Sequence, residues 1–123
     1  MRFRPEQHIR RQGDFRAIRE RGRRYTCGVF TFWCLCHPPE PDNAPAGLRR
    51  AGFIASTAAV GHAVRRNRAK RRLRDVFRRH QLLIPPGCDI LLSARAATVD
   101  APFPELEARF LEACRKVVPA ATP

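Results

Sequence analysis

The chain has 123 residues and carries 24 Lys and Arg against 11 Asp and Glu, a formal net charge of +13. This length predicts one domain, because a chain of this size buries a real but modest apolar core. The longest apolar run, VFTFWCLC, is far shorter than the roughly 20 residues that a membrane-spanning helix needs, so a transmembrane protein is excluded.

The positive charge is concentrated in two segments. Residues 1–24 carry nine Arg against three acidic residues, and residues 65–79 carry nine basic residues against Asp75 alone. Such blocks favour a polyanionic partner, either a nucleic acid or an anionic membrane. Of the 24 basic residues 22 are Arg, which suits phosphate binding and base stacking, although a codon bias of the genome explains this count equally well.

The first predicted element is a short helix in GDFRAIRERG. Asp14 is the expected N-cap and Gly22 the expected C-terminal stop, while Phe15 and Ile18 lie three residues apart on one side. The helix is therefore expected to pack one apolar side against the rest of the domain.

The next segment, YTCGVFTFWCLC, predicts one strand with large apolar residues on both faces. Tyr25, Val29 and Trp33 share one face, and Phe30 and Phe32 share the other. After it, residues 37–50 predict a flexible Pro-rich loop, since they hold four of the 11 prolines. AGFIASTA then predicts a second strand, although its alanines have low strand propensity.

Residues 62–80, HAVRRNRAKRRLRDVFRRH, predict an amphipathic helix. Its apolar stripe consists of Ala69, Leu73, Val76 and Phe77. Its opposite side is formed by Asn67, Arg71, Arg74 and Arg78. Like charges at this spacing repel each other and destabilise the isolated helix. A phosphate backbone along this side would neutralise them, so the segment predicts nucleic-acid binding, with a simply solvated basic face as the alternative. Asn67 is either part of the phosphate-binding side or a local helix cap.

The C-terminal third predicts a turn in IPPGCD, a short buried strand in DILLSAR and an amphipathic helix in FPELEARFLEACRKV. The inner side of this helix holds Phe103, Leu106, Phe110, Leu111 and Cys114. Helices and strands alternate, so we expect a mixed α/β class. The single domain is expected over residues 1–118, with residues 119–123 as a frayed tail.

The five cysteines, an odd number without a CxxC pair, predict a reduced, cytoplasmic chain. The motif CLCH at residues 34–37 raises a zinc site as an alternative. In a strand, however, Cys34 and Cys36 share a face while His37 turns away, and no matching pair lies elsewhere, so we expect small buried residues and no metal. A protein-only nuclease is not favoured, because the acidic residues are scattered and the histidines share no ligand spacing.

RRNRAKRRLRDVF resembles the RNR motif of the protein subunit of bacterial ribonuclease P. The matching positions are Arg66, Asn67, Arg68, Lys70, Arg71 and Arg74. The likeness extends to GDFRAIRERGRR, which resembles the first helix of the family, to GFIAS, which resembles the strand before the motif, and to IPPGCDILLSAR. It covers the chain from about Asp14 to about Val117, and the RNR block is its specific part.

The resemblance implies an α/β fold, an α+β two-layer sandwich in which a small mixed sheet is covered by three helices. It also implies a left-handed β-α-β crossover around the RNR helix, whereas the general rule for such connections predicts the right-handed form. The implied function is an RNA-binding subunit that assists the catalytic ribonuclease P RNA in removing the 5′ leader from precursor tRNA. The implied chemistry belongs to the RNA, with Mg²⁺ bound mainly by RNA and substrate, and no catalytic residue, obligate protein partner or membrane is implied.

The resemblance assigns two binding sites. The RNA subunit is expected to contact Arg65, Arg66, Asn67, Arg68, Lys70, Arg71 and Arg74. The single-stranded leader is expected to contact Phe15, Arg19 and Trp33, where aromatic rings stack on bases, and plain core packing is the alternative for both rings. Arg19 stands where many family members have a second aromatic residue, and STAAVG lacks the usual lysine pair at Thr57 and Ala58.

Two other classes of function are weighed against this one. A generic ribosomal or chromosomal protein would grip nucleic-acid backbone with the same helix and would have no role in catalysis. A helix-turn-helix reader is disfavoured, because GFIASTAAVG provides no helix before the basic one. Attachment to a membrane surface is disfavoured too, since the apolar stripe of the basic helix is narrow and is needed for the core.

Overall fold

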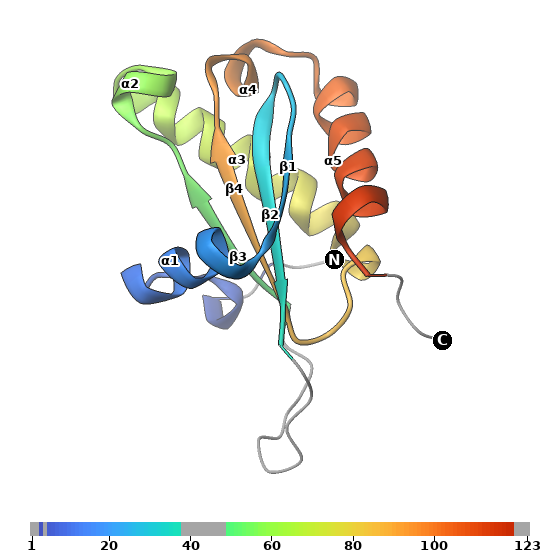
Figure 1. The fold of residues 1–123 in the computed structure, drawn as a ribbon. Helices are drawn as coiled ribbons and strands as arrows, with labels where there is room; N and C mark the ends of the chain where they lie inside the picture. The colour runs from blue at the N-terminus through green and yellow to red at the C-terminus, as the bar shows by residue number, and fades with distance from the viewer. Residues whose placement is uncertain (1–2, 4, 38–48, 120–123) are drawn as a thin grey trace.

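The computed structural model describes residues 3, 5–37 and 49–119 (Figure 1). In chain order its elements are η1 Pro5–Gln7, α1 Gln12–Arg21, β1 Arg23–Thr26, β2 Phe30–Cys36, β3 Arg50–Ile54, α2 Thr57–Val60, α3 Ala63–His80, η2 Gln81–Leu83, β4 Cys88–Ala94, α4 Ala96–Asp100 and α5 Phe103–Val117. The long helices α1, α3 and α5 with one sheet confirm the expected mixed class.

The four strands form one sheet in the order β1-β2-β4-β3. The pairs β1–β2 and β2–β4 are antiparallel, whereas β3 and β4 are parallel neighbours, so the sheet is mixed as expected. The chain leaves β3, passes through α2 and α3, and returns in β4, which confirms a crossover around the basic helix. The left-handed sense of this crossover stays a prediction.

The main core lies on the face of the sheet that α3 and α5 cover (Figure 1). The expected stripe of α3 is fully buried there: Ala69, Leu73, Val76 and Phe77. Phe30 and Phe32 of β2 point into the same core, where Phe32 meets Phe110 of α5 edge to face at 5.6 Å between ring centroids. Burial of these side chains fixes α3 with its polar side outwards, because each large apolar side chain stabilises by about 1.5–3 kcal/mol when buried.

The segment expected as one strand is a hairpin, so that prediction is wrong. The chain turns at Cys27–Val29, and Tyr25 of β1 becomes the partner of Phe32 in β2. Partners in an antiparallel pair share a face, so Tyr25 lies on the main-core side, where its hydroxyl donates to Glu112 at 2.7 Å. Val29 is in the main core as well, and only Trp33 lies on the opposite face as expected.

The helix α1 begins earlier than expected, so the N-cap assigned to Asp14 is wrong. Arg11 occupies the N-cap without a side-chain hydrogen bond, and Asp14 lies in the first turn. The stop at Gly22 is confirmed, and its cause is close packing: a Cβ there would lie 2.4 Å from the carbonyl oxygen of Ile18. Glycine is therefore required by contact and not by an unusual backbone angle.

The expectation of reduced cysteines throughout is wrong for one pair. Cys36 and Cys88 are direct partners in the β2–β4 register and form a disulfide. Cys27, Cys34 and Cys114 carry free thiols. The sequence does not reveal this pairing, because 52 residues separate the two cysteines and only the strand register brings them together.

The predicted loop 37–50 falls mostly outside the described residues, which omit 38–48, and its last residue, Arg50, opens β3. Of the predicted tail 119–123, only Pro119 is described. The domain limits therefore stay predictions. Across the described ranges, no helix combines the length and the apolar character that a membrane crossing needs.

Candidate nucleic-acid interface

The outer side of α3 presents a row of basic side chains opposite its buried stripe. We call this row the basic face; it consists of Asn67, Arg68, Lys70, Arg71 and Arg74. Lys70 is half-buried and the other four are exposed. All five belong to the predicted RNA-subunit site, and the structure brings them together on one side of one helix.

The charges of the basic face are left largely unpaired. Within the part of the chain that the structure describes, no ion pair is recorded for Arg68, Lys70 or Arg71. The guanidinium of Arg74 lies 6.0 Å from the ring centroid of Phe53, a contact that leaves its positive charge in place. These cations are therefore available to an anionic partner.

Two other arginines of α3 are held by backbone carbonyls of neighbouring segments. The Arg65 side chain donates from Nε to the carbonyl of Val60 at 2.8 Å and pairs with Asp100 at 3.1 Å. The Arg72 guanidinium donates to the carbonyls of Val99 and Ala101, which close the end of α4. Arg65 thus has a structural task, and its predicted contact with RNA stays a prediction.

Arg66 and Asn67 lie in the first half of α3. Asn67 follows four residues after the start of the helix at Ala63, so its alternative role as a helix cap is excluded; His62 holds that position. Arg66 is half-buried, and its Nε is buried without a hydrogen-bond partner among the described residues. Its guanidinium therefore retains capacity for a further acceptor.

The single acidic residue of α3 is neutralised near the end of the helix. Asp75 accepts from Arg78 at 2.6 Å and pairs with Arg79 at 3.3 Å. Partial burial raises the pKa of Asp75, but the hydrogen bond from Arg78 and the charge of Arg79 outweigh it and bring the pKa below its usual value. Asp75 therefore offsets the arginines after it and leaves the basic face unscreened.

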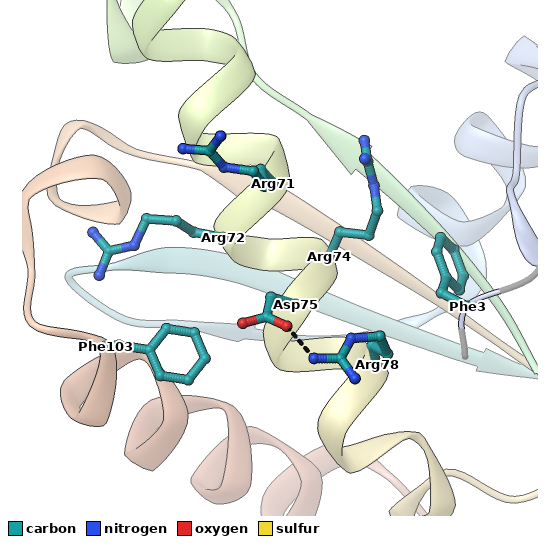
Figure 2. Close-up of a pocket in the computed structure, with 7 residues that line it drawn as sticks. All are labelled: Phe3, Arg71, Arg72, Arg74, Asp75, Arg78 and Phe103. Atoms are coloured by element: carbon teal, nitrogen blue, oxygen red, sulfur yellow. Dashed lines mark hydrogen bonds and ion pairs between the residues drawn. The ribbon is translucent and has the colours of Figure 1, made fainter. Parts of the chain in front are cut away.

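A groove of about 530 Å³ runs along this side of α3 (Figure 2). It is lined by Phe3, Arg71, Arg72, Arg74, Asp75, Arg78 and Phe103. Two aromatic rings thus flank a line of guanidinium groups, a combination that binds phosphate and stacks on unpaired bases. The rings were not predicted as site residues, because only the tertiary fold places them beside α3.

A second, smaller apolar cluster lies on the other face of the sheet, under α1. We call it the aromatic patch; it consists of Phe15 and Trp33 with Ile9, Ile18 and Leu91. Phe15 and Trp33 are half-buried, so each ring is partly open to solvent. The predicted leader-site aromatics are therefore brought together, whereas Arg19 is exposed one turn further along α1 and no contact with either ring is recorded among the described residues.

Gly52 of β3 belongs to this patch but was missed by the sequence analysis. A Cβ at this position would lie 2.5 Å from Cε1 of Phe15 and 3.4 Å from Cβ of Ile9. The missing side chain lets the Phe15 ring lie directly on the sheet. The only signal in the sequence is a glycine inside a strand, which often marks such a close approach.

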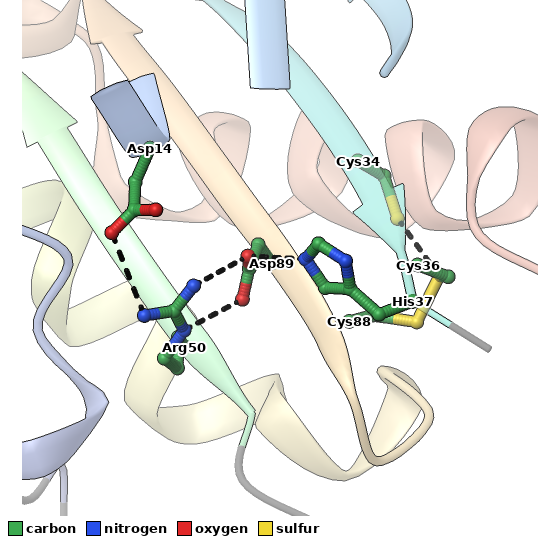
Figure 3. Close-up of polar contacts among 7 residues, drawn as sticks. All are labelled: Asp14, Cys34, Cys36, His37, Arg50, Cys88 and Asp89. Atoms are coloured by element: carbon green, nitrogen blue, oxygen red, sulfur yellow. Dashed lines mark hydrogen bonds and ion pairs between the residues drawn. A yellow bond between two sulfur atoms is a disulfide. The ribbon is translucent and has the colours of Figure 1, made fainter. Parts of the chain in front are cut away.

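A polar network built on the buried Asp89 links α1 to the sheet beside the aromatic patch (Figure 3). Asp89 of β4 is only 3% exposed and accepts two hydrogen bonds from Arg50, at 2.9 and 2.8 Å. Arg50 also lies 3.7 Å from Asp14 of α1, and Nε2 of His37 lies 2.9 Å from Asp89. The hydrogen bond to Asp89 raises the pKa of Arg50, so this guanidinium stays charged beside Asp14 of α1.

The family model and the similar proteins all point to the same family. The family model described as Ribonuclease P matches residues 3–118. A ribonuclease P protein component of Chloroflexus aggregans is 34% identical, with 94% of this chain and 80% of the relative covered. The ribonuclease P protein component of Streptomyces avermitilis is 36% identical, with 82% of this chain and 83% of the relative covered. That of Desulfovibrio desulfuricans is 41% identical, with 71% of this chain but only 62% of the relative covered.

Solved structures of the same family share the fold. The ribonuclease P protein from Thermotoga maritima superposes with a TM-score of 0.72 at 23% identity, over 91% of this chain and 98% of that one. The protein from Staphylococcus aureus gives a TM-score of 0.70 at 24% identity, over 92% and 98% of the two chains. At this identity the likeness supports the fold alone.

Proposed function

The chain belongs to the ribonuclease P protein family, and from this membership we propose that it is the protein subunit of a bacterial ribonuclease P. In this role it binds the catalytic RNA of the enzyme and assists the removal of the 5′ leader from precursor tRNA. The RNA and its bound Mg²⁺ perform the hydrolysis, and the protein stabilises the active RNA. The cytoplasm, where bacterial tRNA precursors are made, is the compartment in which this role is needed.

The unpaired charge of the basic face carries this proposal. Arg68 and Arg71 have no ion pair among the described residues, while Asp75 is neutralised by Arg78 and Arg79. Each phosphate that such a cation neutralises releases condensed counterions, which supplies most of the affinity for an RNA backbone. Cations supplied by the protein also replace part of the Mg²⁺ that a folded RNA requires, so the holoenzyme works at lower Mg²⁺ than the RNA alone.

The aromatic patch supports the second part of the proposal, contact with the single-stranded leader. Phe15 and Trp33 are half-buried rings on the opposite face of the sheet from α3. Stacking of an unpaired base on such a ring gives about 1–3 kcal/mol. Arg19 is exposed on the same helix as Phe15 and provides a cation for the leader backbone.

A comparison of two RNAs distinguishes this proposal from a generic basic binding protein. The dissociation constant is measured for a bacterial ribonuclease P RNA and for a structured RNA of equal length and unrelated sequence, in the same salt. We expect binding to the ribonuclease P RNA to be at least about tenfold tighter, because the basic face and its flanking rings match a defined RNA shape. Equal affinity for both RNAs, with the same steep salt dependence, would instead support a generic backbone-binding module.

A further inference from the structure

Three cysteine sulfurs meet at one end of the sheet, in a cluster that RNA binding does not use. Cys34 and Cys36 come from β2 and Cys88 from β4, and their sulfur atoms all lie within 4.8 Å of one another (Figure 3). Cys34 and Cys88 are 3% and 2% exposed, and Cys36 is half-buried. The strand register supplies Cys88, the partner that the CLCH motif lacks in the sequence.

A disulfide accounts for two of these sulfurs but not for the third. Cys36 and Cys88 are bonded, yet the Cys34 sulfur lies only 3.6 Å from that of Cys36. Thiolates that share a tetrahedral zinc ion at about 2.3 Å from each sulfur stand about 3.8 Å apart. The separation of Cys34 and Cys36 therefore fits two ligands of one metal ion, and all three sulfurs already lie within 4.8 Å of one another.

We propose that in the reduced protein Cys34, Cys36 and Cys88 bind one Zn²⁺ through three thiolates, and that the disulfide is the oxidised, metal-free form of the same site. A dithiol or phosphine supplies the two electrons, and two protons complete the thiols of Cys36 and Cys88. Binding of Zn²⁺ then releases three thiol protons and forms three sulfur–zinc bonds. Oxidation of the Cys36 and Cys88 thiolates returns two electrons to the oxidant and expels the ion.

The three sulfurs are the only donor atoms gathered there among the described residues. His37 directly follows Cys36, but it is not one of the donors that lie within 4.8 Å of one another, and its Nε2 lies 2.9 Å from a carboxylate oxygen of the buried Asp89. His37 is therefore left out of the ligand set, and a water molecule completes the four positions that zinc prefers.

The proposed ion differs in kind from the metal of the proposed RNA reaction. Thiolates are soft ligands that favour Zn²⁺, whereas Mg²⁺ binds oxygen ligands and retains its waters. The site lies on the opposite face of the sheet from the aromatic patch, because Cys34 and Cys88 belong to the main core and Trp33 does not. Zinc would thus join the ends of β2 and β4 without competing with RNA that is bound at the aromatic patch.

Substitution of Cys34 distinguishes a zinc site from a disulfide that has no role in metal binding. The full-length protein is reduced with a phosphine and titrated with Zn²⁺ against a chromophoric chelator. We expect one ion per chain, and Cys34→Ala should weaken binding by about 100-fold or more, because a ligand is lost. Cys27→Ala is the matched control, since Cys27 is a free cysteine outside the cluster, and it should bind Zn²⁺ like the unchanged protein.

A measurement on the unchanged protein guards against a variant that folds poorly. Addition of Co²⁺ to the reduced chain should give a sulfur-to-cobalt charge-transfer band whose intensity corresponds to three thiolates. That band should disappear after oxidation, while the oxidised Cys34→Ala protein should still form the Cys36–Cys88 disulfide. The proposal is overturned if the reduced protein, with all thiols counted as free, binds no Zn²⁺, or if the cobalt band corresponds to fewer than three thiolates.

Discussion

The basic face of α3 and the aromatic patch under α1 lie on opposite faces of the same sheet, and they are built in different ways. The basic face comes from one helix, whose buried stripe leaves its charged side outwards. The aromatic patch takes its rings from α1 and β2 and needs Gly52 of β3 to seat Phe15. The first surface acts through charge and the second through stacking, so substitutions should separate the two effects.

The largest effect should come from charge reversal on the basic face. Arg68→Glu with Arg71→Glu removes two unpaired cations and adds two anions next to the RNA backbone. We expect the affinity for ribonuclease P RNA to fall by about 100-fold, and the slope of log affinity against log salt to become shallower by about 0.7–0.9 for each lost contact. Fluorescence titration over a range of salt measures both quantities.

The matched control for this change is Arg115→Glu, which reverses an exposed charge in the last turn of α5. It should alter the affinity for RNA by no more than a general effect of net charge. If Arg115→Glu weakens binding as strongly per residue as the change on α3, the basic face is not the interface.

A second change tests the division of tasks among the arginines of α3. Arg72→Ala removes two hydrogen bonds to the carbonyls of Val99 and Ala101, so the free energy of unfolding should fall by about 1–3 kcal/mol. Arg71→Ala, one residue away and exposed, should leave stability within about 0.5 kcal/mol and reduce RNA affinity instead. Urea unfolding and RNA titration of both variants give the comparison, and equal loss of stability in the two would contradict it.

The aromatic patch should show a smaller effect that is confined to the substrate. Trp33→Ala should leave assembly with the RNA unchanged but reduce the preference of the holoenzyme for leader-bearing over mature tRNA by about tenfold, through loss of one stacking contact. Competition between the two tRNAs measures this preference. An equal loss of affinity for both tRNAs would show that Trp33 supports the core and not the leader.

The smallest effect concerns pH and reports on Arg74 of the basic face through its neighbour His8. Burial, followed by the charges of Arg74 and Arg10, lowers the pKa of His8. RNA phosphates that neutralise Arg74 should raise this pKa, so the complex takes up a proton and affinity increases as the pH falls from neutral towards the usual His pKa. We expect an increase of about two- to threefold, lost in His8→Gln. A pH dependence that survives this substitution would assign the proton to another group.

The sequence predicts the two long helices of the main core well, because their apolar residues recur at a strong helical period. The predicted stripes of α3 and α5 include the buried Leu73, Phe77, Leu106 and Phe110. The hairpin was missed, because Gly28 is a weak turn signal inside a continuous run of strand-forming residues. A hairpin changes which residues share a face, and this moved Tyr25 to the opposite side.

The candidate site is predictable only in part for a similar reason. In the sequence Arg65 and Arg72 look like Arg68 and Arg71, yet the first two are held by groups of α2 and α4 that only the fold brings near. The expectation that GFIASTAAVG provides no helix is wrong, because α2, Thr57–Val60, lies there directly before α3. α4 was not predicted either, so the effect of these two short helices on the arginines was missed. For the same reason the sequence does not show that Cys88 lies beside the cysteines of the CLCH motif, because only the strand register brings them together.

Cleavage of precursor tRNA by reconstituted holoenzyme tests the central claim most directly. A bacterial ribonuclease P RNA is assayed at low Mg²⁺, alone and with the purified protein, and the product ends are mapped. We predict little cleavage by the RNA alone and efficient cleavage at the mature 5′ end when the protein is added. The protein that carries both Arg68→Glu and Arg71→Glu should not stimulate cleavage. Tight RNA binding by the protein without any stimulation of cleavage would contradict the proposed role.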